Sequence, residues 1–371
     1  MRRSSRHWRV ASVILLLAVV CLPFEAAGGV VPSASETRLR QVTGQRVEAT
    51  KKRTGKRRVS AAQRARARRA RLARLRAEAA RRQWLEAATP RYKLDENGEL
   101  VPDVRAAAAI IYDPVSGEVV WEENSQDKRS IASITKVMTV AVVLEESPDL
   151  ARAVTIQRSD VYRANHTYLR RGDRVTVEDL LHLSLIASDN AAARALARTA
   201  PGGAGAFVDR MNERALELGL ESTSYADPSG LDSANVSSAF DMARLIAFAA
   251  SDERIAEIMR KPSHSIHTGR RTINFNNTNQ FVRATNPHVE ASAFEVRGAK
   301  TGFISQAGYC LASLLQLPQT GQQYAVVILG ARSSAVRFME TQHLFNWVKG
   351  RATAAFAGAT EAASAAASSA P

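Results

Sequence analysis

The stretch from Lys51 to Arg82 limits how this chain can fold, because it cannot contribute to a hydrophobic core. It is rich in Ala and Arg, and Val59, Leu72 and Leu75 are its only bulky apolar residues. A segment of this composition buries too little apolar surface to offset the entropy lost on ordering. The packed part of the protein must therefore come from the residues that follow it.

Charge is distributed unevenly along the chain. The formal net charge is +15, but residues 31–93 hold 20 Lys and Arg against 4 Asp and Glu, and residues 94–371 carry a net charge of −4. We predict a basic linker over 30–91, disordered or partly helical, because Ala and Arg favour helix. Two interpretations of this linker stay open: a solvated tether, which we favour, or an electrostatic contact with membrane lipid or acidic wall polymers. Nucleic-acid binding is not expected.

The N-terminus has the three-part pattern of a secretory signal. A basic stretch ends at Arg9, an apolar run extends from Val10 to Phe24, and small residues follow up to Gly29. We predict a signal peptide over 1–29 and hence an exported, periplasmic protein. The apolar run is short for a spanning helix, which needs roughly 20 residues. An uncleaved anchor, which would keep the protein membrane-associated, stays open as the alternative.

Cysteine and histidine usage argues against a disulfide, a metal or a cofactor. Cys310 is the only cysteine after the signal and lies in an apolar strand pattern, which predicts a packed core residue. The seven histidines lack the spacing of a metal site, and no glycine-rich phosphate loop is present. We expect neither metal nor cofactor.

Residues 92–349 have the pattern of one α/β domain, followed by a disordered Ala/Ser-rich tail over 350–371. Strand patterns come first, a helical block follows, and strand patterns then return, which predicts one antiparallel sheet of about five strands with a mostly helical insertion. The expected strands are 106–112, 118–121, 294–298, 308–315 and 324–330, and the expected helices are 133–144, 176–187, 204–218, 238–250 and 334–348.

The first of three motifs that carry chemistry is Ser133-Ile134-Thr135-Lys136, at the start of an apolar helix. Residues three apart on a helix share a face, so the side chains of Ser133 and Lys136 can converge. Burial would favour the neutral amine of Lys136, which could then accept the proton of the Ser133 hydroxyl. The backbone N–H groups at a helix start also suit a developing oxyanion.

The second motif is Ser188-Asp189-Asn190, in the loop after an apolar helix. A hydroxyl and an amide two residues apart can point into one cleft. Ser188 could then pass a proton between Lys136 and the leaving group, and Asn190 could orient Lys136 or the substrate amide. Alone, the motif is more typical of a turn that caps the next helix.

The third motif is Lys300-Thr301-Gly302, at the end of a strand pattern. A cation can hold a substrate carboxylate, the Thr301 hydroxyl can bind it, and Gly302 lets a substrate backbone approach a strand edge. Each motif alone is a weak signal, but their occurrence in this order is the known mark of penicillin-binding proteins and class A β-lactamases.

The sequence resembles the low-molecular-weight penicillin-binding D-alanyl-D-alanine carboxypeptidases and endopeptidases from about Ala106 to Val348. The resemblance rests on three segments and is supported by Asp227-Pro228-Ser229-Gly230-Leu231-Asp232. The three segments are Ile131-Ala132-Ser133-Ile134-Thr135-Lys136-Val137-Met138-Thr139, Ala187-Ser188-Asp189-Asn190-Ala191-Ala192 and Lys300-Thr301-Gly302-Phe303. It implies a single penicillin-binding/serine β-lactamase-like domain that acts on peptidoglycan peptides and is inhibited covalently by β-lactam antibiotics.

The resemblance also implies a role for each site residue. Ser133 is the acylated nucleophile and Lys136 the general base. Ser188 relays a proton, and Asn190 positions Lys136 or the substrate amide. Lys300 and Thr301, beside Gly302, clamp a carboxylate, and the backbone N–H groups of Ser133 and Phe303 form an oxyanion hole.

Within the family, the endopeptidase branch is modestly favoured over the carboxypeptidase branch. Only 69 residues follow Gly302, too few for the further β-rich domain that carboxypeptidases typically carry, and Asn277-Thr278-Asn279 looks like the endopeptidase branch. A serine β-lactamase and an inactive wall-binding protein stay open as alternatives. No Glu-x-x-Leu-Asn segment, which class A β-lactamases use for deacylation, occurs between Asn190 and Lys300.

Overall fold

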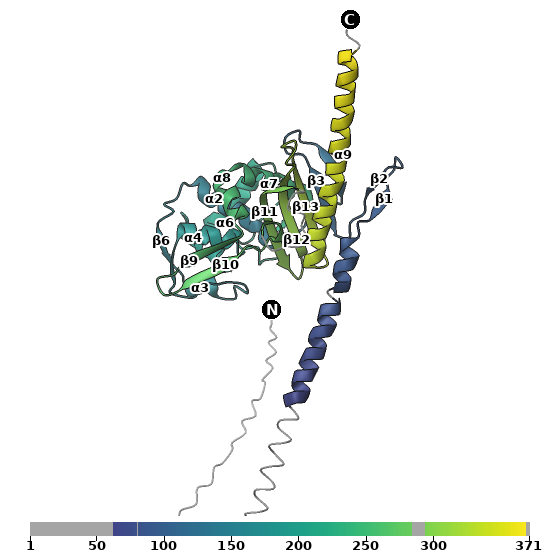
Figure 1. The fold of residues 1–371 in the computed structure, drawn as a ribbon. Coiled ribbons are helices and arrows are strands. Elements are labelled where there is room, and N and C mark those ends of the chain that lie inside the picture. The colour runs from purple at the N-terminus through teal and green to yellow at the C-terminus, as the bar shows by residue number, and fades with distance from the viewer. Residues whose placement is uncertain (1–61, 80, 284–293, 369–371) are drawn as a thin grey trace, which may run out of the picture. The chain divides into compact units, whose positions relative to one another are not determined.

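The computed structural model describes residues 62–79, 81–283 and 294–368. Its central element is an antiparallel sheet with the strand order β11-β12-β13-β3-β4 (Figure 1). These strands are β3 Ala108–Tyr112, β4 Val119–Glu123, β11 Glu295–Ile304, β12 Gly308–Gln316 and β13 Gln323–Ala331. The chain leaves the sheet after β4 and returns at β11, which confirms the predicted α/β fold with a mostly helical insertion.

Helices of the insertion cover one face of the sheet around α2, of which ten of the eleven residues are buried. A helix that is apolar all round is stable only inside a core, so α2 becomes the centre of the domain. The helical elements of this block are η1 Ala132–Ile134, α2 Thr135–Glu145, α3 Arg158–Val161, α4 Val177–Leu185, α5 Asn190–Thr199, α6 Gly203–Glu217, α7 Ala239–Ser251, α8 Glu253–Arg260 and η2 Gln280–Val282. Of the five helices predicted from sequence, four correspond to α2, α4, α6 and α7.

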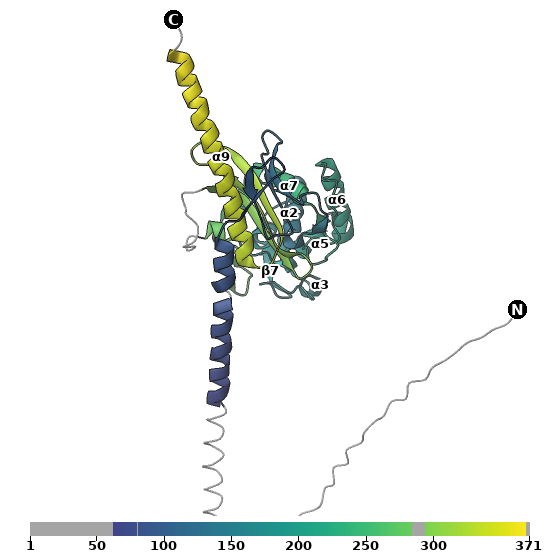
Figure 2. The same cartoon turned by 90° about the vertical axis from the view of Figure 1, so that its right-hand side faces the viewer.

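The opposite face of the sheet is covered by α9 (Ser334–Ser368), as Figure 2 shows. Side chains alternate along β13: Val327 and Leu329 belong to the core around α2, whereas Val326 and Ile328 belong to the core beneath α9. This period of two is the geometry of a strand buried on both faces.

Three features differ from the predicted boundaries. The strand predicted to end at Gly298 continues as β11 to Ile304, with a register shift between Val296 and Gly298. The tail predicted to be disordered from residue 350 instead continues α9 to Ser368, in a stretch dominated by Ala, the best helix former. Ala87 is fully buried in the core beneath α9, so packing begins before residue 92.

Four small two-stranded sheets complete the part of the fold that the structure describes. They pair β1 (Tyr92–Leu94) with β2 (Leu100–Pro102), β5 (Arg129–Ser130) with β8 (Val236–Ser237), β6 (Ala153–Thr155) with β7 (Arg174–Thr176), and β9 (Ser263–His267) with β10 (Thr272–Asn276). The strands β9 and β10 lie near α3, at the end of the helical block farthest from α9 (Figure 1).

The predicted signal peptide (1–29) and residues 30–61 of the predicted linker lie outside the described residues. Residues 62–79 and 81–88 are helical. In the part of the chain that the structure describes, no helix has both the length and the apolarity required to cross a bilayer.

Candidate active site

One wall of the candidate site is built at the junction of η1 and α2. The Lys136 Nζ donates to the Ser133 Oγ over 2.9 Å, and Ser133 itself is half-buried. Ala132, just before it, has a φ of 49°, in the left-handed region that a residue with a Cβ seldom occupies. Strained backbone of this kind is often found at functional sites, and here it directly precedes Ser133.

Lys136 is fully buried and surrounded by oxygen acceptors. Besides Ser133, its Nζ donates to the Asn190 Oδ1 over 2.6 Å and to the backbone carbonyl of Ser229 over 2.5 Å. Burial lowers the pKa of Lys136 to about 7, although the negative charges of Asp227 and Asp189 partly oppose this. The amine can therefore exist in its neutral form near neutral pH and accept a proton.

Asn190 is fixed by the start of α5. Asp189 caps this helix through the Ala192 N–H, over 3.0 Å, and the Asn190 Nδ2 donates to the Ala164 carbonyl over 2.7 Å. Both ends of the Asn190 amide are therefore bound, and its orientation toward Lys136 is determined by the fold. Ser188 precedes them with a left-handed φ of 58°.

The opposite wall is β11, an edge strand. The Lys300 Nζ donates to the Ser188 Oγ over 2.9 Å and to the Thr301 carbonyl over 2.8 Å. Lys300 is buried, and the pKa of its amine lies well below the usual value because of burial and then the positive charges of Lys136 and Arg337. Ser188 thus contacts Lys300, and the relay of a proton between Lys136 and the leaving group, predicted for Ser188 from the sequence, stays a prediction.

Gly302 allows the two walls to meet. A Cβ at this position would lie 2.7 Å from the Ile131 carbonyl oxygen and 3.2 Å from the Ser133 nitrogen. Only a residue without a side chain therefore lets β11 run beside the start of α2. The predicted oxyanion donors, the N–H groups of Ser133 and Phe303, lie on these two adjacent segments.

Three features at the site could not be found by their motifs. Arg337, on α9, donates to the carbonyls of Gly302 and Cys310 over 3.0 and 3.2 Å, and burial lowers its pKa to about 10. Thr278 accepts a 2.7 Å hydrogen bond from the Thr301 hydroxyl. Gly230, after the Ser229 carbonyl that binds Lys136, has a φ of 77°, and a Cβ there would lie 2.0 Å from the Ala132 oxygen. Gly230 lies in the Asp227–Asp232 segment and Thr278 in the Asn277–Asn279 segment that the sequence singled out, whereas Arg337 belongs to no such segment.

Phe303 and Tyr309 form a stacked aromatic pair where β11 and β12 meet, with ring centroids 4.2 Å apart. Phe303 is 49% exposed, and its partner Tyr309 packs against the core beneath α9. Cys310, in contrast, is fully buried, as predicted for a core residue.

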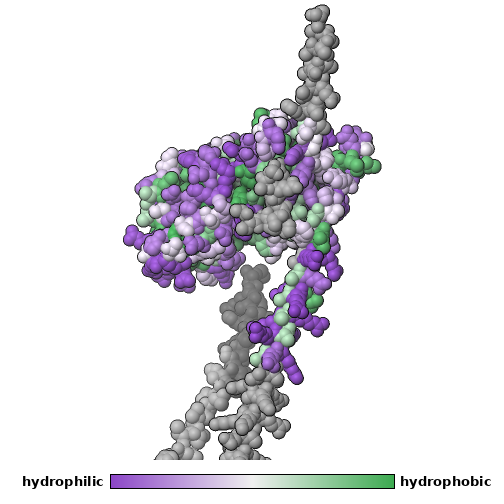
Figure 3. Space-filling model, in the orientation of Figure 1, coloured by the Kyte–Doolittle hydropathy of each residue, from purple (hydrophilic) through white to green (hydrophobic). Residues whose placement is uncertain are grey.

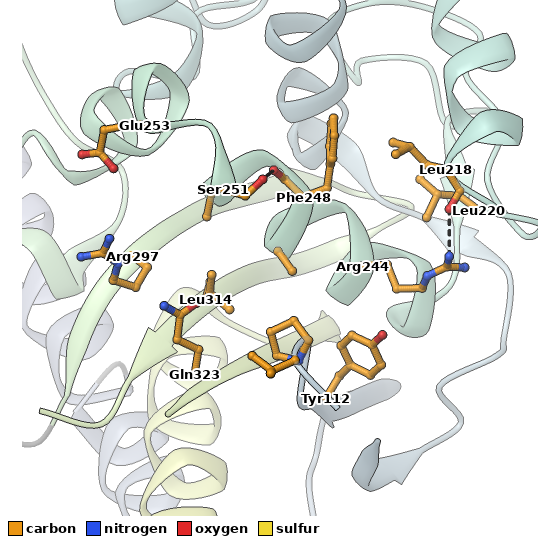
Figure 4. A pocket seen from close by; sticks show the side chains of 14 residues that line it. Tyr112, Leu218, Leu220, Arg244, Phe248, Ser251, Glu253, Arg297, Leu314 and Gln323 are labelled. Carbon is orange, nitrogen blue, oxygen red and sulfur yellow. Dashed lines mark hydrogen bonds between the residues drawn. The ribbon is translucent and has the colours of Figure 1, made fainter. Parts of the chain in front are cut away.

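A separate pocket of about 560 Å³ lies between α7, α8 and the sheet (Figure 4). Tyr112, Phe248 and Leu314 give it an apolar lining, and Arg244 and Arg297 lie toward opposite ends of it. None of the predicted site residues lines it. Among the described residues, no group of three or more His, Cys, Asp and Glu side chains is arranged to hold a metal ion.

Known proteins resemble this chain in both sequence and fold. The D-alanyl-D-alanine endopeptidase of Pseudomonas aeruginosa is 31% identical over 260 residues, covering 69% of this chain and 81% of the relative. The carboxypeptidase DacC of Escherichia coli is 33% identical over 258 residues, covering 66% and 62%. The structure of penicillin-binding protein D2 of Listeria monocytogenes, in its cefotaxime-bound form, has a TM-score of 0.57 at 26% identity and covers 66% of this chain and 97% of its own.

The family match itself spans most of the described domain. Residues 95–333 match the family described as D-alanyl-D-alanine carboxypeptidase, and this range contains all three motifs. The resemblance inferred from the motifs is confirmed: the chain belongs to the D-alanyl-D-alanine carboxypeptidase family of serine peptidases.

Proposed function

We propose that this protein is a serine D-alanyl-D-alanine endopeptidase that cuts D-alanyl to diaminopimelate cross-links in peptidoglycan. The observation that carries the proposal is the 2.9 Å contact between the Ser133 hydroxyl and the buried Lys136 amine, whose pKa is about 7. A nucleophile beside a base that is neutral near the working pH is the requirement for acyl-enzyme chemistry.

Acylation begins with proton transfer from the Ser133 Oγ to the Lys136 Nζ. The Oγ forms a bond to the carbonyl carbon of the D-alanyl residue, and the carbonyl electron pair moves onto oxygen. When the C–N bond breaks, the leaving amine takes up a proton that originates from Lys136. Because Ser188 contacts Lys300, we assign the relay of that proton to Ser188 with Lys300. Water then releases the acyl group by the reverse path.

The remaining site residues stabilise or orient the charged and reacting groups. The N–H groups of Ser133 and Phe303 stabilise the oxyanion, and such a donor is typically worth about 10² to 10³ in rate. Lys300 and the Thr301 hydroxyl hold the carboxylate of the residue that leaves. Asn190 keeps the Lys136 amine directed at Ser133 through its 2.6 Å hydrogen bond.

The endopeptidase assignment rests on the relatives as well as on the chain. The match covers 81% of the Pseudomonas aeruginosa relative, which is named an endopeptidase. It covers 62% of the carboxypeptidase relative. Carboxypeptidase trimming of pentapeptides is therefore the second candidate. β-Lactams are expected to acylate Ser133 and to leave slowly, since the chain lacks the Glu-x-x-Leu-Asn segment.

Export to the periplasm, with removal of residues 1–29, is part of the proposal. It is supported by the basic and apolar pattern of the N-terminus and by the location of peptidoglycan outside the membrane. The basic segment over 30–91 is assigned the role of a solvated tether, with contact to anionic lipid or wall polymers as its alternative.

Labelling with a fluorescent penicillin tests the mechanism. The full chain and Ser133→Ala are compared, and mass spectrometry locates the adduct. An adduct on Ser133 that persists for many minutes is expected, with none in Ser133→Ala. Loss of the label within seconds would indicate a β-lactamase, and no adduct on the folded protein would favour a wall-binding role.

Purified muropeptides then test which bond is cut. Conversion of a cross-linked dimer to monomers is the expected result. An intact dimer, together with loss of the terminal D-alanine from a pentapeptide monomer, would replace the endopeptidase with a carboxypeptidase.

A further inference from the structure

A group of exposed arginines lies on α3, the loop after it, β7 and the β9–β10 turn, and this loop contacts Asn190 of the candidate active site. The members of this arginine patch are Arg158, Arg163, Arg170, Arg171, Arg174 and Arg270. Within the described residues, none of these side chains forms an ion pair or donates a hydrogen bond. The corresponding end of the molecule is largely hydrophilic in Figure 3.

The two acidic residues in this stretch do not neutralise the patch. Asp160 is buried and binds the Arg198 guanidinium through two contacts of 2.8 Å. Asp173 is also buried and contacts Arg271 over 3.2 Å. Each carboxylate is therefore occupied by an arginine from outside the patch. Because residues 94–371 as a whole carry a net charge of −4, this positive surface is a local feature.

The loop that carries the patch is part of the support of the catalytic side chains. Its carbonyls of Ala164 and His166 accept from the Asn190 Nδ2 and the Asn190 N–H over 2.7 and 3.1 Å. Its Tyr168 N–H donates to the Asp189 carboxylate over 2.6 Å. A ligand bound to the patch would therefore lie next to the loop that holds Asn190.

Backbone strain and charge give two further signs of function in this loop. Arg163 and Asn165 both have left-handed φ values, 50° and 55°, which residues with a Cβ avoid unless the fold imposes them. Arg194, bound to the Tyr162 carbonyl over 2.8 Å, is close enough for its positive charge to help lower the pKa of Lys136.

We propose that the arginine patch binds carboxylates on stem peptides of polymeric peptidoglycan and so holds the cross-linked wall against the active site. This proposal rests on the proposed function and deepens it by naming a second contact with the substrate. Guanidinium groups match carboxylates in geometry and charge, and diaminopimelate carries two carboxyl groups. Several weak contacts on one polymer raise its effective concentration at Ser133.

The test compares the full chain with the triple variant R163Q/R170Q/R171Q. Digestion of insoluble cross-linked peptidoglycan at low salt should fall about tenfold, since each exposed ion pair contributes little but three are removed. Acylation of Ser133 by labelled penicillin should not change, which also shows that the variant is folded. The charge-preserving R163K/R170K/R171K and the remote Lys128→Gln should both retain most of the digestion rate.

Further measurements separate the outcomes. Amidation of the free carboxylates of the peptidoglycan should remove the difference between wild type and the triple Gln variant. Equal digestion of unmodified peptidoglycan by both proteins, or a difference that persists after amidation, would overturn the patch proposal. Loss of binding to anionic lipid vesicles without loss of digestion would overturn it in favour of a membrane contact. Absence of penicillin acylation in the wild type would instead count against the proposed function.

Discussion

Two buried lysines face each other across the candidate site, and their surroundings differ. Lys136 lies on the helical wall among three oxygen acceptors, with Asp227 and Asp189 near enough to raise its pKa against the effect of burial. Lys300 lies on the strand wall, where both charged groups that influence it, Lys136 and Arg337, are positive. One residue type therefore has two different electrostatic environments within one cleft.

The different electrostatic environments of Lys136 and Lys300 indicate different roles for the two lysines. The pKa of about 7 lets Lys136 exchange a proton near neutral pH without any ligand. Lys300 gains a favourable charge partner only when an anion enters the cleft, because the groups around it repel a proton. Binding of the substrate carboxylate and protonation of Lys300 are thus coupled, whereas Lys136 works as a base.

Arginine in place of each lysine should separate the two roles most strongly. Lys136→Arg keeps the positive charge but cannot act as a base, since a guanidinium does not lose its proton in proteins. Acylation of Ser133 should fall about 10² to 10⁴-fold, the usual contribution of general acid–base catalysis. Lys300→Arg keeps the charge that a carboxylate requires and should lose far less. Stopped-flow acylation by penicillin measures both, and equal losses would contradict the different roles.

The sequence predicts the helical wall better than the strand wall, for a physical reason. Ser133 and Lys136 are three residues apart on one helix, so their contact is fixed by local geometry. The Ser188 to Lys300 contact joins residues 112 apart, and its identity depends on how β11 packs on the helical block. The motif alone did not show that Ser188 would contact Lys300.

The sequence also did not predict some helices and hydrogen-bonding groups that lie outside the three motifs. The short helices α5 and α8 were not predicted from the sequence, although Ile255, Ile258 and Met259 of α8 are buried at helical spacing and could have indicated it. The Ser229 carbonyl is a backbone acceptor, which every residue offers, and Arg337 is one of many arginines in the chain. The five-stranded sheet, in contrast, could be predicted because long apolar strands bounded by turns mark it.

Loss of the Lys300 charge should have the next largest effect, and it should depend on the substrate. Lys300→Gln removes a charge-assisted hydrogen bond, so kcat/KM for a D-alanyl-D-alanine peptide should fall about 10 to 100-fold. With a peptide whose terminal carboxylate is a carboxamide, wild type and variant should differ by less than about threefold, because no charged partner remains. A loss of the same size on both peptides would show that Lys300 acts on chemistry and not on the carboxylate.

Arg337→Met should have a smaller effect, through the backbone of the strand wall. The side chain holds the Gly302 carbonyl, and its loss leaves buried acceptors unpaired and the Phe303 N–H less firmly placed. Acylation should fall about tenfold, below the effect of removing an oxyanion donor outright. Because Arg337 also lowers the pKa of Lys300, the pH at which carboxylate binding is lost should rise in this variant. Arg351→Met, exposed on the same helix, is the matched control, and an unchanged pH profile in Arg337→Met would reduce Arg337 to a packing role.

The smallest effect is the pH response of the wild type near neutrality, and it tests both lysines together. With a Lys136 pKa of about 7, the neutral amine fraction roughly halves between pH 8 and pH 7 and falls about fivefold more by pH 6, and the acylation rate should follow it. The same shift makes the free energy of unfolding rise with pH between about 7 and 10.5, because the unfolded chain then binds a proton that the buried amine does not.

Carboxylate binding requires a protonated Lys300 and should weaken as pH rises. The acylation rate should therefore rise with pH through about 7 for a carboxamide peptide, whereas the ratio of the carboxylate-peptide rate to the carboxamide-peptide rate should fall as pH rises. A ratio that does not change with pH would mean that Lys300 does not bind the carboxylate through its charge.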